Sequence, residues 1–344
     1  MPRLSICIPT YNRAAFLAKL LSITFRKNFR DVEVVISDNN STDDTAAIVK
    51  KFQKRYANIV YSKNPTNIGF DANLLKVVSL ASGDYCWVLG DDDVLYSHAI
   101  ATALGYTRSG DDCYLIGVDL YTLDMRFISN WQYLQGVREG ETFNMASQED
   151  MLNYLSHVRA NAGLFGYIGG FIFKRKYWGE IVLPKSLKGL GWAHVYMMWS
   201  FKNFQAKLKY FPRPLVKLRT QNDTTTKEKS FIARFTLEYK GLYLTALKLF
   251  GEDSPLFNAF LMSIVRYIRP WAVPPLFILR GQSKKDWPEL AKWIKKYPYK
   301  DSFKKSLNSP FRINPLYFLR LLVNKPYLKW IKKPFKLAKD FFIP

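Results

Sequence analysis

Short apolar runs alternate with amphipathic stretches in the first part of the chain. Four such runs, each followed by polar or glycine-containing turns, are Leu4–Ile8, Val32–Ser37, Ile59–Tyr61 and Tyr85–Leu89. Between the runs, apolar residues recur at helical spacing, as from Phe16 to Leu21. Continuous apolar runs are typical of central strands in a parallel sheet, and strands that alternate with helices predict helices on both faces of it. The pattern therefore predicts an α/β protein.

The fourth run leads into three consecutive carboxylates, Asp91, Asp92 and Asp93. Ligands of open α/β sheets bind at the carboxyl ends of the strands, which is where these acids fall. Neighbouring carboxylates repel one another, and oxygen ligands of this kind suit a hard divalent cation such as Mg²⁺ or Mn²⁺. The turn therefore predicts a metal site, with a solvated acidic turn as the alternative.

Polar residues also follow the earlier strands. Thr10 and Tyr11 are suited to pack against a nucleobase and bond to it, and Asp38 ends the second strand, where a carboxylate can accept a bond from a ribose hydroxyl. Asn67 and Gly69 precede the third predicted helix. Each of these residues has a structural alternative, because Asp, Asn and Gly are ordinary turn residues.

Common nucleotide-binding signatures are missing from the sequence. It contains neither the glycine-rich dinucleotide fingerprint nor the phosphate-loop lysine motif, so a dehydrogenase or an ATPase is disfavoured. A nucleotidyltransferase should carry an early glycine- and lysine-rich loop for a triphosphate. Residues 9–13 are not such a loop, which leaves that enzyme class as a weaker alternative.

Four motifs resemble those of family-2 glycosyltransferases with the GT-A fold, in that family's order and spacing. They are Ser5–Asn12, Ile36–Asp43, Asn67–Gly69 and Gly90–Asp93. The sequence SDNNSTDDT at residues 37–45, which includes most of the second motif, is similar to the corresponding sequence of bacterial O-antigen sugar transferases of the abequosyltransferase type. The resemblance implies a Rossmann-like GT-A domain that uses a CDP-, UDP- or dTDP-sugar. It favours a dideoxyhexose such as abequose, carried on CDP, as the donor.

The resemblance also implies a role for each matching residue. Nucleotide-sugar contacts are expected from Pro9, Thr10, Tyr11, Asp38, Asn67, Gly69, Asp91 and Asp92. Asp91 and Asp93 match the two acids of the Asp-x-Asp motif and are the expected metal site. Asp93 would hold Mn²⁺ or Mg²⁺ on the diphosphate, while Asp91 would meet the donor. Such a cation neutralises the charge that builds on the leaving nucleoside diphosphate.

Inverting transfer needs a base that takes the proton of the acceptor hydroxyl. The family usually uses an Asp at the start of a helix for this, and His194 stands in that place within Gly191–Trp199. His194 is the leading candidate, and a metal or phosphate contact and a structural role are its alternatives. Asp119 and Asp124, near the end of a strand predicted at Tyr114–Tyr121, are the reserve bases.

Arg219 follows a proline-containing stretch late in the predicted domain. In relatives a comparable arginine lies near the diphosphate, so the resemblance implies that Arg219 pairs with phosphate oxygens. The alternative is a surface arginine in a polar loop.

The C-terminal third is strongly basic. The 344-residue chain has a formal net charge of +23, and residues 226–344 hold 24 Lys and Arg against 8 Asp and Glu. Amphipathic helices are predicted at Phe231–Phe250 and Pro255–Ile268. We therefore expect a glycosyltransferase domain at residues 1–225 and a basic, aromatic-rich helical region at 226–344.

The later part of this region mixes Lys and Arg with aromatic residues, as in Tyr317–Leu322 and Tyr327–Lys333. Basic and aromatic residues on short helices are typical of segments that lie on anionic lipid. The alternative is a helical region with a solvated basic face. Nucleic-acid binding shares the composition, but no nucleic-acid-binding fold is recognised and no such partner is expected.

The three cysteines, Cys7, Cys86 and Cys113, lack metal-ligand spacing and are expected to be buried free thiols. The chain opens on a strand without a signal peptide, and no stretch of about 20 apolar residues is free of charge. We therefore expect a peripheral protein on the cytoplasmic face of the inner membrane. The resemblance implies a polyprenyl-diphosphate-linked oligosaccharide as its acceptor. The non-enzymatic alternative is a membrane- or RNA-binding protein with a non-catalytic GT-A domain.

Overall fold

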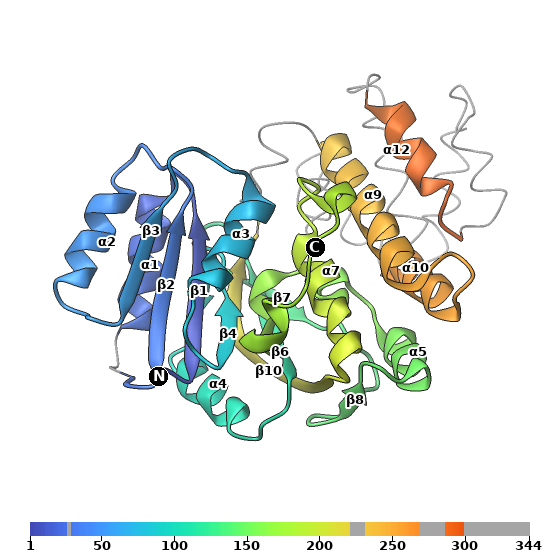
Figure 1. The fold of residues 1–344 in the computed structure, drawn as a ribbon, viewed down its shortest axis with the longest axis horizontal. Helices are drawn as coiled ribbons and strands as arrows, with labels where there is room; N and C mark the ends of the chain where they lie inside the picture. Colours follow the sequence, from blue (N-terminus) through green and yellow to red (C-terminus); the bar gives the residue numbers. More distant parts are fainter. Residues whose placement is uncertain (26–28, 221–230, 268–285, 299–344) are drawn as a thin grey trace.

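The computed structural model describes residues 1–25, 29–220, 231–267 and 286–298. At its centre is a ten-stranded mixed sheet with the order β3-β2-β1-β4-β9-β6-β10-β5, in which β7 pairs with β6 and β8 with β10 (Figure 1). The strands are β1 (Leu4–Thr10), β2 (Val32–Asp38), β3 (Ile59–Lys63), β4 (Tyr85–Val88), β5 (Val94–Leu95), β6 (Cys113–Tyr121), β7 (Phe127–Trp131), β8 (Thr142–Asn144), β9 (Phe171–Lys174) and β10 (Lys207–Arg219).

The longer helices alternate with these strands and then follow them. They are α1 (Ala14–Thr24), α2 (Thr45–Gln53), α3 (Phe70–Ser79), α4 (Ala99–Thr107), α5 (Gln148–His157), α7 (Ala193–Trp199), α9 (Phe231–Phe250), α10 (Pro255–Tyr267) and α12 (Trp287–Ile294). The predicted α/β class and the four predicted N-terminal strands are confirmed.

Strands β1, β2, β3 and β4 are parallel, as the alternating pattern predicts. Every residue of β1 and of β2 is buried, so both faces of this part of the sheet are covered. The register places Thr10 opposite Asp38 and Cys7 opposite Val88. The loops that leave these strands therefore emerge at one edge of the sheet.

The second half of the sheet is less evident from the hydrophobic pattern. Strand β9 runs antiparallel to both β4 and β6, and joins the two halves. Strand β10 pairs with β6 in parallel, and its register shifts around Pro214. Proline cannot donate a ladder hydrogen bond and is accommodated at such irregularities. Because of its prolines, this long strand is not predicted from the hydrophobic pattern.

The C-terminal helices lie on the opposite side of the molecule from β3 (Figure 1). Helix α9 has the predicted bounds, and α10 begins at the predicted Pro255. The ring of Trp199 at the end of α7 lies 5.7 Å from Phe250 and 5.6 Å from Phe260, so both helices pack on the sheet-bearing part. In the part of the chain that the structure describes, no helix has the length and apolar character needed to cross a membrane.

Three predictions about the chain have different outcomes. All three cysteines are buried and free, as expected. The basic aromatic segments at residues 317–322 and 327–333 lie outside the described residues, as does the proposed domain boundary between 225 and 226. Those two remain predictions.

Gly117 in β6 provides a test of the packing between β6 and β10. A Cβ atom at this position would lie 2.0 Å from the backbone oxygen of Pro212. Because backbone cannot move aside without disturbing the pairing, Gly117→Ala should lower the free energy of unfolding by about 2–3 kcal/mol. The measurement is chemical denaturation.

Gly105→Ala is the matched control for this substitution. Gly105 is an exposed glycine of α4, and a methyl group added to it would meet open space, with no contact inside 4 Å from the described residues. Alanine there should be neutral or stabilise the helix by about 0.5–1 kcal/mol. Equal effects of the two substitutions would contradict the packing described for Gly117.

Candidate active site

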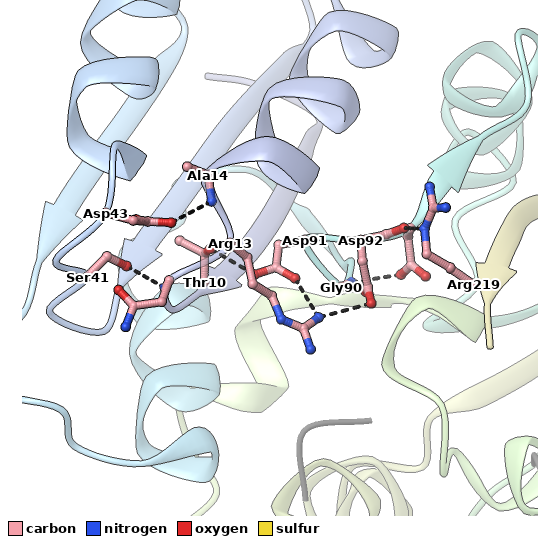
Figure 2. A network of polar contacts seen from close by, with 11 residues as sticks. Thr10, Arg13, Ala14, Ser41, Asp43, Gly90, Asp91, Asp92 and Arg219 are labelled. Atoms are coloured by element: carbon pink, nitrogen blue, oxygen red, sulfur yellow. Dashed lines mark hydrogen bonds and ion pairs between the residues drawn. The ribbon is translucent and has the colours of Figure 1, made fainter. Parts of the chain in front are cut away.

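The turn Gly90–Asp93 follows β4 and is held against the loop after β1. The Thr10 hydroxyl donates to Asp91 Oδ2 at 2.8 Å. Arg13 Nη1 lies 3.2 Å from Asp91 Oδ1 and 2.9 Å from Asp92 Oδ2, so one guanidinium nitrogen bridges two carboxylates (Figure 2). Part of the repulsion expected in this turn is therefore relieved by Arg13, a residue to which the sequence analysis gave no role.

Asp93 is not held in the same way. Its Oδ2 accepts a bond from the Gly90 backbone N–H at 2.8 Å, but its Oδ1 is buried and has no hydrogen-bond partner among the described residues. The Tyr167 hydroxyl is close enough to Asp93 to influence the pKa of the carboxyl, yet within the described chain it too lacks a hydrogen bond of standard geometry. A buried carboxylate oxygen without a partner is costly, so Asp93 is the acid in this turn that must either be protonated or gain a further ligand.

The electrostatics of the turn agree with its geometry. Burial raises the pKa of Asp91 to about 6, although the Arg13 charge acts in the opposite direction. Burial and the neighbouring Asp92 charge raise the pKa of Asp93 well above its usual range. A cation close to Asp93 would reverse this by favouring the ionised form.

The residues present fit a metal ion that is shared with a substrate. Asp93 offers an unpartnered buried oxygen, but among the described residues no group of three or more His, Cys, Asp or Glu side chains converges on one point. Mg²⁺ is commonly held by one or two carboxylates together with substrate phosphates and water. The turn is therefore suited to a metal–diphosphate unit and not to an all-protein cage.

Asp38 lies at the same edge of the sheet and is fully buried. Its Oδ1 accepts a bond from the Ser41 backbone N–H at 2.7 Å, and its Oδ2 accepts one from the Tyr61 hydroxyl at 2.7 Å. Ser41 in turn accepts a bond from the Asn12 backbone N–H at 2.9 Å. Asp38 therefore shapes the loop after β2 and, through Ser41, fixes it to the loop after β1.

Asn67 and Gly69 belong to a network of amide side chains. Asn39 donates to Asn67 Oδ1 at 2.8 Å and accepts a bond from the Ile68 backbone N–H at 2.9 Å. Asn67 Oδ1 also accepts from the Gly69 N–H at 2.9 Å, and Gly69 has the left-handed φ of +82°. These contacts fix the loop before α3 to the loop after β2. The network centres on Asn39, which the sequence analysis did not single out.

The residues around these loops differ in exposure. Pro9 and Thr10 are buried, whereas Tyr11 is 42% exposed. Ile68 and Phe70, from the neighbouring loop and the start of α3, are 41% and 48% exposed. Large apolar side chains are therefore accessible beside the buried polar network, which suits contact with a base or sugar ring.

His194 lies in the first turn of α7 and is only 3% exposed. Its Nε2 lies 3.3 Å from the Gly166 carbonyl oxygen, and its Nδ1 is buried without a hydrogen-bond partner in the described parts of the chain. The ring stacks on Trp192 and meets Phe70 edge-on, with centroids 5.9 and 6.4 Å apart. Burial lowers the pKa of His194 to about 4, and the Arg234 charge adds to this, so the ring is neutral at pH 7.

The chain connects His194 to the acidic turn. Gly166, which lies against His194, is followed directly by Tyr167, which influences Asp93. With Nε2 donating to the Gly166 carbonyl, Nδ1 carries the lone pair that could accept a proton. His194 is therefore linked to the acidic turn through Gly166 and Tyr167 and has an acceptor nitrogen without a partner among the described residues, but it is deeply buried.

Asp71 is a site residue that the sequence analysis missed. It lies in the first turn of α3, 4% exposed, and accepts bonds from the backbone N–H groups of Gly191 at 3.0 Å and Ala193 at 3.3 Å. Burial raises the pKa of Asp71, while these amides act to lower it. Asp71 thus joins α3 to α7, the helix that carries His194. In sequence it looks like an ordinary acid at a helix start.

Arg219 is the last residue of β10 and is buried, so the alternative of an exposed loop arginine is wrong. Its Nε donates to the Asp92 carbonyl at 3.3 Å, as Figure 2 shows, and its Nη1 donates to the Leu123 carbonyl. The guanidinium also lies over the Phe16 ring, 5.2 Å from its centre. Arg219 therefore brings a positive charge to the back of the acidic turn and lines a cavity of about 550 Å³ beside α1.

The reserve bases are engaged elsewhere. Asp119 is buried and accepts bonds from the Tyr96 hydroxyl and from Asn130 Nδ2, the latter at 2.6 Å. Asp124 lies at the surface and pairs with Arg126 at 2.8 Å. Both residues therefore have partners of their own, and their assignment as reserve bases stays a prediction.

Comparison with known proteins identifies the family. The model of Glycosyl transferase family 2 matches residues 5–171. The abequosyltransferase RfbV of Salmonella typhimurium is 34% identical over 272 residues, which are 78% of this chain and 81% of that protein. A Campylobacter jejuni GalNAc(5)-diNAcBac-PP-undecaprenol beta-1,3-glucosyltransferase is 36% identical over 111 residues, 32% of this chain and 36% of its own length.

Solved structures support the fold. Residues 1–349 of S. aureus TarS in complex with UDP-GlcNAc superimpose with a TM-score of 0.59 at 14% identity, over 86% of this chain and 82% of that one. The mannosyltransferase PcManGT of Pyrobaculum calidifontis, in complex with GDP-Man and Mn2+, gives a TM-score of 0.56 at 15% identity, over 96% and 84% of the two chains. The chain therefore belongs to glycosyltransferase family 2 and is a nucleotide-sugar glycosyltransferase with the GT-A fold.

Proposed function

We propose that this enzyme transfers a sugar, with inversion, from a nucleotide sugar to an oligosaccharide carried on polyprenyl diphosphate in O-antigen or related polysaccharide synthesis. Asp93, which lies just after the carboxyl end of β4, is the observation that supports a metal-assisted reaction. Its buried Oδ1 has no hydrogen-bond partner among the described residues. The similarity to RfbV favours an abequose-type dideoxyhexose on CDP as the first donor to test. The name of the Campylobacter relative supports an acceptor linked to undecaprenyl diphosphate.

Each loop at this edge of the sheet has a proposed role in binding the nucleotide-sugar donor. The exposed Tyr11 and the loop at Asp38 flank the nucleobase and ribose, while the loop at Asn67 and Gly69 lies along the donor. Asp93 would hold Mn²⁺ or Mg²⁺ with the diphosphate. A divalent cation there supplies Lewis-acid stabilisation of the charge on the leaving group.

The acceptor supplies a hydroxyl as the nucleophile, and the enzyme removes the proton of that hydroxyl. In a single in-line displacement the acceptor hydroxyl oxygen bonds to the anomeric carbon as the bond from that carbon to the diphosphate oxygen breaks. The hydroxyl proton passes to His194 Nδ1, which has no competing hydrogen bond from the described residues. The burial that makes His194 a weak base also excludes water from the reacting groups.

The basic composition of the C-terminal region supports a second part of the proposal, that the enzyme docks on anionic lipid from the cytoplasm. Each Lys or Arg near such a surface contributes roughly 1 kcal/mol, and the region after residue 225 has a large excess of them. Docking would bring the active site to an acceptor whose lipid stays in the bilayer.

Asp93→Asn should abolish transfer in a radiolabelled-donor assay with CDP-, UDP- and dTDP-sugars, and should remove the Mn²⁺-dependent thermal shift. Without metal, the variant should be at least as stable as the wild type. Because the folded pKa of Asp93 is raised, the stability of the wild type falls as pH rises above about 4, and the variant lacks this loss. The variant should therefore equal or exceed the wild type in unfolding temperature at pH 7.5. Near-wild-type turnover would refute the metal role.

His194→Ala should lower kcat by about 10²-fold or more, because the acceptor proton loses its base. His194→Gln keeps a polar side chain of similar size and should be equally impaired, whereas a purely structural histidine would be partly rescued by it. Steady-state kinetics with saturating donor and acceptor separate kcat from KM. A change confined to the donor KM would point to a phosphate or metal contact instead.

Vesicle flotation of the full chain tests the docking proposal. Vesicles rich in phosphatidylglycerol should carry the protein at low salt, and binding should weaken at high salt because the attraction is electrostatic. Vesicles of phosphatidylcholine alone are the control. Absence of the protein from the anionic vesicles at low salt would contradict the proposal.

A further inference from the structure

The acidic turn divides its three carboxylates into a pair that is held and one that is not. Arg13 Nη1 contacts Asp91 Oδ1 and Asp92 Oδ2, and the Thr10 hydroxyl takes the other Asp91 oxygen. Asp93 Oδ1 has no hydrogen-bond partner in the described structure. Both Asp91 oxygens are therefore engaged by protein groups, and the unengaged buried oxygen belongs to Asp93.

Arg13 is well placed to keep this division. It follows directly from the loop after β1, which is fixed to the loop after β2 by the hydrogen bond from the Asn12 backbone N–H to Ser41. Its ion-paired side chain is only 19% exposed, and those of Asp91 and Asp92 are 7% and 14% exposed. Ion pairs shielded from water in this way are screened much less than surface pairs. Arg13 thus belongs to the frame of the site and not to a mobile surface.

The charges also balance in a particular way. Three ionised carboxylates carry a charge of −3, and Arg13 together with Arg219 behind the turn reduces this to −1, which leaves the turn favourable to a divalent cation that arrives with an anionic diphosphate. If Arg13 were absent, the same turn would present three competing carboxylates to the metal. The metal could then bind between Asp91 and Asp92 without any substrate.

We propose that Arg13 is a positioning residue that keeps Asp91 and Asp92 out of the metal's coordination sphere, so that the ion binds at Asp93 only together with the nucleoside diphosphate. This deepens the proposed function and rests on it. With a single protein carboxylate the ion is held weakly until the diphosphate supplies further oxygens. Arg13 thereby makes metal binding depend on the donor.

Mn²⁺ binding, followed by the EPR signal of the free ion, tests this without any turnover. Wild-type protein should bind Mn²⁺ alone weakly, and CDP, UDP or dTDP, whichever it accepts, should tighten binding by at least about tenfold. Arg13→Gln should bind Mn²⁺ alone about tenfold or more tightly than the wild type, because a nearby positive charge is lost and both Asp91 and Asp92 lose their ion pair with it. The increase in Mn²⁺ affinity that the nucleotide causes should therefore be smaller in Arg13→Gln than in the wild type.

Arg126→Gln is the matched control, since Arg126 also pairs with an aspartate but lies on the surface, with its side chain 83% exposed. It should bind Mn²⁺ like the wild type. Unchanged or weaker binding of Mn²⁺ alone by folded Arg13→Gln would overturn the proposal. Circular dichroism confirms the fold of each variant.

Asp92→Asn and Asp93→Asn give an independent test that does not need the Arg13 variant to fold. In the presence of nucleotide, Asp92→Asn should keep its Mn²⁺ affinity within about threefold, whereas Asp93→Asn should lose at least about tenfold. Equal losses would overturn the role of Arg13 while leaving the metal site at this turn. No loss in Asp93→Asn would remove the proposed metal role itself, and the Arg13 proposal with it.

Discussion

Burial of charge at the end of β4 is the constraint on which the site depends. Asp91 and Asp93 are almost fully buried, and a buried carboxylate must be neutralised, paired or protonated. The fold meets this demand with Arg13 for one side of the turn, and the described residues leave one oxygen of Asp93 unsatisfied. We propose that a cation and an anionic substrate together compensate for this buried charge. The polar contacts around the turn can be understood as support for that state.

The sheet provides this support by bringing loops together. Parallel strands β1, β2 and β4 deliver their carboxyl ends to one edge, and the antiparallel strand β9 returns the chain so that Tyr167 reaches Asp93. Asp71 then links the donor-side helix to the helix of His194. Helix α3 and the helix that carries the proposed base are thus fixed to one another. That connection runs through backbone amides, which hold a carboxylate in a defined orientation.

Local patterns predicted the N-terminal half of the fold well. The apolar runs and the acidic turn located β1, β2, β3 and β4 and placed Asp38, Asp91 and Asp93 at one edge, because strand direction fixes where such residues emerge. The same reasoning could not find the contacts that join distant segments. Nothing in the local sequence distinguishes Arg13 from a surface arginine or Asp71 from a helix-capping acid, since their roles arise only when the loops meet. The long strand β10 was hidden by its prolines, and the burial of His194 depends on packing against Trp192 and Phe70.

The acidic turn is thus built, we propose, to hold a metal ion at Asp93. The most direct measurement is anomalous diffraction at the manganese edge from crystals grown with Mn²⁺ and the nucleoside diphosphate that the enzyme accepts. We expect one Mn²⁺ bonded to Asp93 Oδ1 and to diphosphate oxygens, with Arg13 still between Asp91 and Asp92. Manganese seated between Asp91 and Asp92, or nucleotide bound with no metal at the turn, would contradict this assignment.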